Sequence, residues 1–303
     1  MNKKSPVFIC ALLFFVIVLF GDSCFGKNLS SIEIKKIEDG IAKIKEQARG
    51  PQRAGYMELK VIGADAVPFL IEILNDKNVN RESRRMTCLL LGELKAREAV
   101  NMLIYTLKND SYTVREAACK ALGEIKDSKA AEPLMGMLQD IEAKVRAQAL
   151  YSLINFSDKR ISLEAVKFLK DNNQEVRLAA ATVLNEKISK DTSEALRTAL
   201  EKDSYYQVRA TCAQALGKIK DINALDVLIW SVKEDKDATV RAACATSLGQ
   251  LNDKKAIPAL IEALSDEYKD VQLNTSRSLA GLTGKNFGKD YQAWIEWYKS
   301  QNK

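Results

Sequence analysis

Residues 114–125 read VREAACKALGEI, and closely similar stretches recur at 208–219 (VRATCAQALGKI) and 240–251 (VRAACATSLGQL). In the first copy, apolar residues occupy positions one, four, five, eight, nine and twelve, which is the spacing of one stripe along an α-helix. Alanines in the middle of the stripe would allow a neighbouring helix to approach closely. The stretch therefore predicts an amphipathic helix that packs against other copies of itself.

The register of this helix can be followed along most of the chain. A second apolar pattern, such as KAAEPLMGML at 129–138, precedes each copy and predicts another helix before it. Repeats of this length are typical of a solenoid of stacked helical hairpins, in which each hairpin contacts only its neighbours. The leucine near the end of the second helix recurs at intervals of 31 or 32 residues, at Leu91, Leu122, Leu153, Leu184, Leu216, Leu248 and Leu279.

The N-terminus carries a targeting pattern. Two lysines precede the apolar run 7–20, which is short for a membrane span of about 20 residues and typical of a secretory signal. Small residues at Cys24 and Gly26 predict cleavage after Gly26 and an exported protein of the periplasm or cell envelope. Two alternatives stay open. Cys24 could carry a lipid, although Asp22 stands where a lipobox has a small residue, or the segment could remain as an uncleaved anchor.

Composition excludes several classes of protein. The chain contains no histidine, which removes histidine-based catalytic triads and histidine metal sites. The formal net charge of +6 is a small surplus and gives weak support for nucleic-acid binding. We therefore expect no cofactor, no catalytic site and no nucleic-acid partner.

The repeated phrase can be written VR..AA.ALG.I.D..A...L...L.D, and it resembles HEAT repeats, in particular the bacterial HEAT-like subtype named after phycobilisome lyases. The resemblance implies an all-α fold, a right-handed α-solenoid of about seven hairpins. It says little about function. Some HEAT-repeat proteins are metal-dependent hydroxylases with His-Glu iron sites, which a chain without histidine cannot build. Lyases of the same subtype assemble biliproteins in the cytoplasm, where a secretory signal would not leave this chain.

Both ends of the array predict capping segments. Residues 30–48 place isoleucines at helical spacing, and RGPQR at 49–53 is expected to break this helix through its glycine and proline. After the repeats, Asp290 can cap a last helix whose aromatic residues would cover the end of the core. The expected organisation is a signal peptide, an N-terminal helix with a half-repeat, the HEAT-like array and a C-terminal capping helix, at 1–26, 27–63, 64–283 and 284–303. Within the array, LINF and LNEK replace LGEI in the unit around 154–190, which predicts a local change of curvature.

An arginine stands seven residues before six of the seven leucines. Arginine near the start of a helix lies at the unfavourable end of the helix dipole and should need a carboxylate partner. An aspartate precedes each arginine by five or six residues, in the turn between the two helices. The arginines are Arg84, Arg115, Arg146, Arg177, Arg209 and Arg241, and the aspartates are Asp110, Asp140, Asp171, Asp203, Asp235 and Asp266. We interpret them as a ladder that ties each repeat to the next, with a phosphate-binding stripe as the alternative.

Four cysteines occupy equivalent helix positions: Cys88, Cys119, Cys212 and Cys244. Stacked helices lie about 8–10 Å apart, whereas a disulfide needs Cα atoms within about 7 Å. The cysteines are therefore expected to be buried small side chains despite the oxidising compartment. A reactive or chromophore-bearing thiol is the alternative.

Two further sets of residues are candidates for a partner surface. Tyr112 and Tyr206, with Tyr268, lie in turns just before second helices and could either pack locally or anchor a partner. Lys120, Tyr151, Gln214, Thr246 and Arg277 share one helical position opposite the leucines and would line the concave face. We expect an exported, non-catalytic scaffold that binds another protein through this face. The alternatives are a solvated face without a partner, an accessory factor of lyase or chaperone type for another protein's cofactor, and a membrane-tethered structural component of the envelope.

Overall fold

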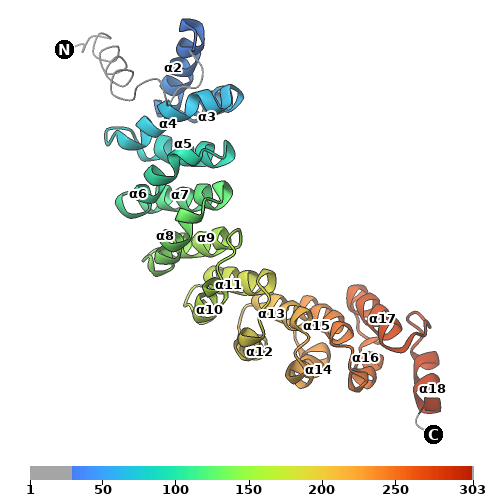
Figure 1. The fold of residues 1–303 in the computed structure, drawn as a ribbon. Coiled ribbons are helices and arrows are strands. Elements are labelled where there is room, and N and C mark those ends of the chain that lie inside the picture. Colours follow the sequence, from blue (N-terminus) through green and yellow to red (C-terminus); the bar gives the residue numbers. More distant parts are fainter. Residues whose placement is uncertain (1–28, 302–303) are drawn as a thin grey trace. The chain divides into compact units, whose positions relative to one another are not determined.

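The computed structural model describes residues 29–301, so the predicted signal peptide and the role of Cys24 lie outside the described residues. All regular elements in this range are helices (Figure 1). The chain divides into two compact units, one ending at Leu70 and the other beginning at Ile71. None of the helices between residues 29 and 301 has both the length and the apolar character that a bilayer-spanning helix needs.

The first unit contains the hairpin of α2 (Ser31–Lys45) and α3 (Arg49–Ile62), followed by the 3-10 turn Gly63–Ala66. A capping box starts α2, because the Ser30 hydroxyl accepts from the backbone N–H of Glu33 while the Glu33 carboxylate accepts from that of Ser30. The expected break at RGPQR is wrong. Helix α2 already ends at Lys45, and RGPQR forms the first turn of α3, where the missing N–H of a proline costs little.

Seven helical hairpins follow within the described residues, and each pairs a first helix with a second helix (Figure 1). The first helices are preceded by short 3-10 turns in five hairpins. The hairpins are α4 (Val67–Asn75) with α5 (Arg81–Glu93), α6 (Val100–Asn109) with α7 (Tyr112–Ile125), α8 (Ala131–Gly136) with α9 (Ala143–Leu153), α10 (Arg160–Phe168) with α11 (Gln174–Glu186), α12 (Ser193–Lys202) with α13 (Tyr206–Ile219), α14 (Leu225–Glu234) with α15 (Ala238–Leu251), and α16 (Ile257–Ala263) with α17 (Lys269–Thr283).

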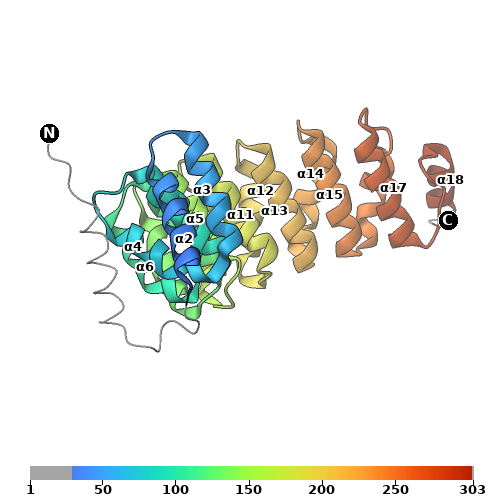
Figure 2. The ribbon, with the colours of Figure 1, turned by 90° about the horizontal axis from the view of Figure 1, so that it is seen from above.

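In the second unit, each second helix packs against the second helix of the next hairpin, as the series α5, α7, α9, α11, α13, α15 and α17. Figure 2 shows α13, α15 and α17 side by side in this series. The repeated leucine is fully buried in every hairpin, and so are most of the alanines of the repeated phrase. This arrangement confirms the prediction of an all-α solenoid built from hairpin repeats.

The glycine of the ALG phrase allows these helices to stack. A Cβ atom added to Gly123 would lie 2.6 Å from the Cβ of Ser152 in the next hairpin, and one added to Gly249 would lie 2.6 Å from the Oγ of Ser278. Gly92 is equally close to its neighbour, since an added Cβ would lie 2.7 Å from the Cα of Ala121. The glycine therefore marks the point of closest approach between successive second helices.

The unit around 154–190 lacks this glycine. Ile154 and Asn185 occupy its position, and both are half-buried. The Oδ1 atom of Asn185 is buried and has no hydrogen-bond partner among the residues described. Side chains at these two positions prevent the closest approach that glycine allows elsewhere. The predicted change of curvature in this unit stays a prediction.

Helix α18 (Tyr291–Gln301) closes the array by packing against α16. Trp294 is fully buried, its ring meets Phe287 and Trp297 edge-on, and its Nε1–H donates to the carbonyl of Gly288 at 3.0 Å. The Asp290 carboxylate accepts from the backbone N–H of Ala293 at 3.0 Å and so starts the helix. Tyr291 is 41% exposed, so one tryptophan rather than the full aromatic set covers the core.

Candidate functional site

The structure places each ladder arginine against the aspartate of the following hairpin. In every pair, the Nε–H and one Nη2–H of the arginine donate to the two carboxylate oxygens at distances between 2.6 and 3.0 Å. This side-by-side geometry suits the planar guanidinium group and would not be reproduced by lysine. The pairs are Arg84–Asp110, Arg115–Asp140, Arg146–Asp171, Arg177–Asp203, Arg209–Asp235 and Arg241–Asp266.

Each arginine is also fixed to the turn that precedes it in its own hairpin. The Nη1–H of Arg209 donates to the backbone carbonyl of Asp203 at 2.9 Å, and that of Arg241 donates to the carbonyl of Asp235 at 2.8 Å. One arginine therefore joins the turn of its own hairpin to the turn of the next one. Because the donors on Nε, Nη1 and Nη2 are engaged within the chain, the ladder offers few free donors to a phosphate.

Glutamine takes the ladder position at both ends of the series. The Nε2–H of Gln272 in α17 donates to the carbonyl of Asp266 at 2.6 Å, as the arginines do, but no aspartate of a further hairpin follows it. In the first unit, Gln52 is buried and donates to the carbonyl of Glu46 at 2.6 Å. Sequence reasoning missed the role of Gln52. Extending the register by 32 residues from Leu91 to Leu59 would have identified it, since Gln52 lies seven residues before Leu59.

The ladder pairs are shielded from water, most strongly in the pair Arg209–Asp235, whose side chains are 6% and 4% exposed. The hydrogen bond with Asp235 raises the pKa of Arg209 above its ordinary value. Burial alone would raise the pKa of Asp140, but hydrogen bonds from Arg115 and from the backbone of Glu142, with the charge of Arg115, hold it below its ordinary value. Both partners are therefore charged at neutral pH.

The four cysteines named in the sequence analysis are buried free thiols. Burial raises the pKa of all four thiols well above the ordinary range, so that thiolate is scarce at neutral pH. This arrangement matches the interpretation of these residues as small core side chains.

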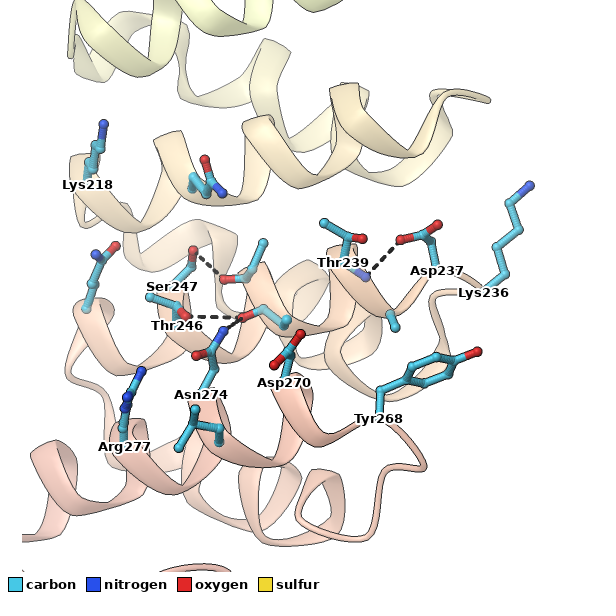
Figure 3. A pocket seen from close by; sticks show the side chains of 16 residues that line it. Lys218, Lys236, Asp237, Thr239, Thr246, Ser247, Tyr268, Asp270, Asn274 and Arg277 are labelled. Atoms are coloured by element: carbon cyan, nitrogen blue, oxygen red, sulfur yellow. Dashed lines mark hydrogen bonds between the residues drawn. The ribbon is translucent and has the colours of Figure 1, made fainter.

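The five residues that share one helical position are all exposed. We call this row the second-helix face: Lys120 on α7, Tyr151 on α9, Gln214 on α13, Thr246 on α15 and Arg277 on α17. Its last three members line one groove of about 910 Å³ that α13, α15 and α17 form together (Figure 3). Lys120 and Tyr151 lie outside this groove.

The tyrosines before the second helices do not behave alike. Tyr112 is 38% exposed at the start of α7, whereas Tyr206 is half-buried and meets the ring of Tyr205 edge-on, with 5.5 Å between ring centroids. Tyr268 is 51% exposed on the rim of the groove, and the Arg241 guanidinium carbon lies 5.5 Å from its ring centroid. Tyr112 and Tyr268 are therefore accessible, and Tyr206 packs locally.

No group of three or more cysteine, aspartate or glutamate side chains between residues 29 and 301 converges in a way that could hold a metal ion. The chemistry that this surface offers is recognition by charged, amide and aromatic side chains.

Comparison with known families settles the class of protein. A family model of HEAT repeats matches residues 67–154, 162–245 and 225–286. The chain belongs to the HEAT-repeat family. No curated protein matches the sequence. The resemblance to HEAT repeats that the repeated phrase carries is thereby confirmed.

Solved structures of HEAT-repeat type are similar to this chain. The X-ray structure of Escherichia coli YibA is 21% identical, with a TM-score of 0.66 over 86% of this chain and 100% of that chain. An engineered protein is 18% identical, with a TM-score of 0.53 over 82% of this chain and 78% of that chain. The complex of CpcE and CpcF of phycocyanin lyase from Nostoc sp. PCC7120 is 20% identical over 86% of this chain and 98% of that chain, with a TM-score of 0.44. Likeness at this identity concerns the fold, and we transfer no activity from it.

Proposed function

We propose that this HEAT-repeat protein is an exported, non-catalytic scaffold that binds a partner protein across the second-helix face. The observation that carries the proposal is a contrast between two sets of residues in the same helices. The side chains beneath the face repeat from hairpin to hairpin and form the core and the ladder. The five exposed side chains of the face all differ: lysine, tyrosine, glutamine, threonine and arginine.

The fold suits such a task because a solenoid presents a wide surface whose elements have fixed spacing. Bidentate pairs between successive hairpins hold the exposed positions at that spacing. Tyr151, which is 36% exposed, and the exposed Arg277 belong to the residue types that most often dominate binding at protein interfaces. Mixed charge along the face favours a protein partner over nucleic acid.

Export is the second part of the proposal, and its support is the signal pattern of the first 26 residues. We expect the mature protein to begin at Lys27, which N-terminal sequencing of the purified protein would test. If the protein is instead retained in the membrane fraction and Cys24→Ala releases it, the membrane-tethered alternative is supported. If the entire chain remains in the cytoplasm, export is contradicted and the lyase-type alternative gains support.

Crosslinking followed by affinity purification from the periplasmic fraction tests the proposed binding. We expect one partner to be captured by the wild-type protein and lost with the double variant Lys120→Glu, Tyr151→Ala. The matched control is Lys202→Glu, which changes the charge of an exposed residue on the first helix α12. Equal capture by the two variants would contradict the proposal that the second-helix face binds the partner.

A further inference from the structure

The groove between α13 and α17 has a simple physical origin. The outward residues of α15 are small, namely Thr239, Ala242, Ala243 and Thr246, so this helix forms a low floor. The neighbouring helix α17 presents Asp270, Leu273, Asn274 and Arg277 as one wall, and α13 presents Gln214 and Lys218 as the other. The groove follows the axis of α15, and its volume of about 910 Å³ is sufficient for a short segment of polypeptide.

Opposite charges mark the two ends of this groove. Figure 3 shows Lys218 and Arg277 together on one side of the view, and Asp237 and Asp270 to their right. Arg277 and Asp270 have no hydrogen bond or ion pair within residues 29–301, although both are exposed and line the groove. The ladder arginines, by contrast, are all paired. A charged ligand would therefore meet unpaired partners at both ends.

The floor and walls between the charged ends carry amide groups. Gln214 and Gln250 form no hydrogen bond inside the part of the chain described, and both line the groove. Amide side chains donate and accept at once, as a peptide backbone does. An α-helix has already satisfied its backbone groups internally, whereas an extended chain of polyproline-II type leaves them free. The lining therefore favours an extended segment over a helical one.

We propose that this groove binds an extended segment of a partner protein that carries an acidic side chain and a basic side chain three positions apart. The acidic group would face Lys218 and Arg277, and the basic group would face Asp270 and Asp237. Asp270 and Arg277 are seven residues apart on α17, which corresponds to about 10 Å along the helix axis. Three residues of a polyproline-II chain span about 9 Å and return to the same side. This inference rests on the proposed function and names the site and the chemistry of the partner.

Site-specific photo-crosslinking in the full-length protein tests the inference. A photo-crosslinking amino acid is placed in the source cells at Thr246, on the groove floor, and separately at Tyr151, the same helical position outside the groove. The crosslinked partner peptide is then sequenced by mass spectrometry. We expect position 246 to crosslink a segment with an acidic and a basic residue three positions apart. Arg277→Glu should lower the yield by about tenfold, the effect expected for losing one complementary charge pair. The matched control Lys120→Glu, at the equivalent position of α7, should leave it unchanged.

The outcomes separate this inference from the proposed function. Crosslinking from position 151 but not from 246 overturns the groove proposal and leaves the scaffold intact. Crosslinking from neither position overturns both. A peptide without the charge pair, a second copy of this chain, or a yield that Arg277→Glu does not change would each overturn the proposal for the groove.

Discussion

Arg209→Ala is the substitution that most severely tests the role of the ladder. Arg209 and Asp235 are 6% and 4% exposed, and two hydrogen bonds of 2.7 and 2.8 Å join them. Without the arginine, the Asp235 carboxylate stays buried with a backbone N–H, that of Asp237 at 2.9 Å, as its remaining listed-distance contact of this kind. Removing one partner of a buried ion pair costs about 3–5 kcal/mol, because the other charge loses its compensation. Arg146 and Asp171 are 17% and 10% exposed, so Arg146→Ala should cost less, about 1–3 kcal/mol.

Urea unfolding followed by far-ultraviolet circular dichroism measures both variants. We expect the midpoint to fall in both and to fall further for Arg209→Ala. Because each hairpin contacts only its neighbours, weakening the α13–α15 interface should also broaden the transition or divide it into two steps. A double variant, Arg209→Met with Asp235→Leu, should recover most of the lost stability, since replacing a whole buried pair by apolar residues is often neutral. If Arg209→Ala lies within about 0.5 kcal/mol of the wild type, a change typical of neutral surface substitutions, the ladder does not stabilise the fold.

Three other predictions concern packing, thiols and pH. Gly123→Val should lower the free energy of unfolding by about 1–3 kcal/mol through a clash with Ser152, whereas Gly136→Ala, which meets open space, should be neutral or stabilising; urea midpoints of the two variants decide. The four buried cysteines should resist a thiol reagent in the folded mature chain and react once urea unfolds it, and rapid labelling of the folded protein would revive the reactive-thiol alternative. The pKa of Asp140 and Asp266 is lower in the folded chain than in the unfolded one, so their contribution to stability is complete above about pH 4 and is lost as the pH falls through the folded pKa. Asp140→Asn should flatten that loss in urea midpoints measured between pH 6 and 2, and a wild-type protein that gains stability on acidification in this range would contradict the assignment.

Much of the fold follows from the sequence because its information is local and repeated. The period of the leucines fixes which residues share a core, and the phase of arginine and aspartate indicates that the two meet. Period alone does not reveal that each arginine reaches the aspartate 25 or 26 residues further on while holding the turn behind it. That choice depends on the distance between stacked hairpins, which only the packed helices define.

Other features escaped for the same reason. Gly123 is needed because of Ser152 in another hairpin, so its own helix gives no signal of the close approach. The groove depends on four small residues of α15 being lower than the side chains of both neighbouring helices. RGPQR misled because glycine and proline break a helix in its interior, whereas here they lie in its first turn.

The central claim is that the repeated residues build this protein and the varied exposed residues bind its partner. The most direct test is the amount of partner captured at a temperature at which every variant is folded, compared between Arg146→Ala and the double variant Lys120→Glu, Tyr151→Ala. We predict that Arg146→Ala melts earlier but captures the partner normally, while the double variant melts as the wild type does and captures little. Normal melting with lost capture in Arg146→Ala, and full capture by the double variant, would contradict the claim.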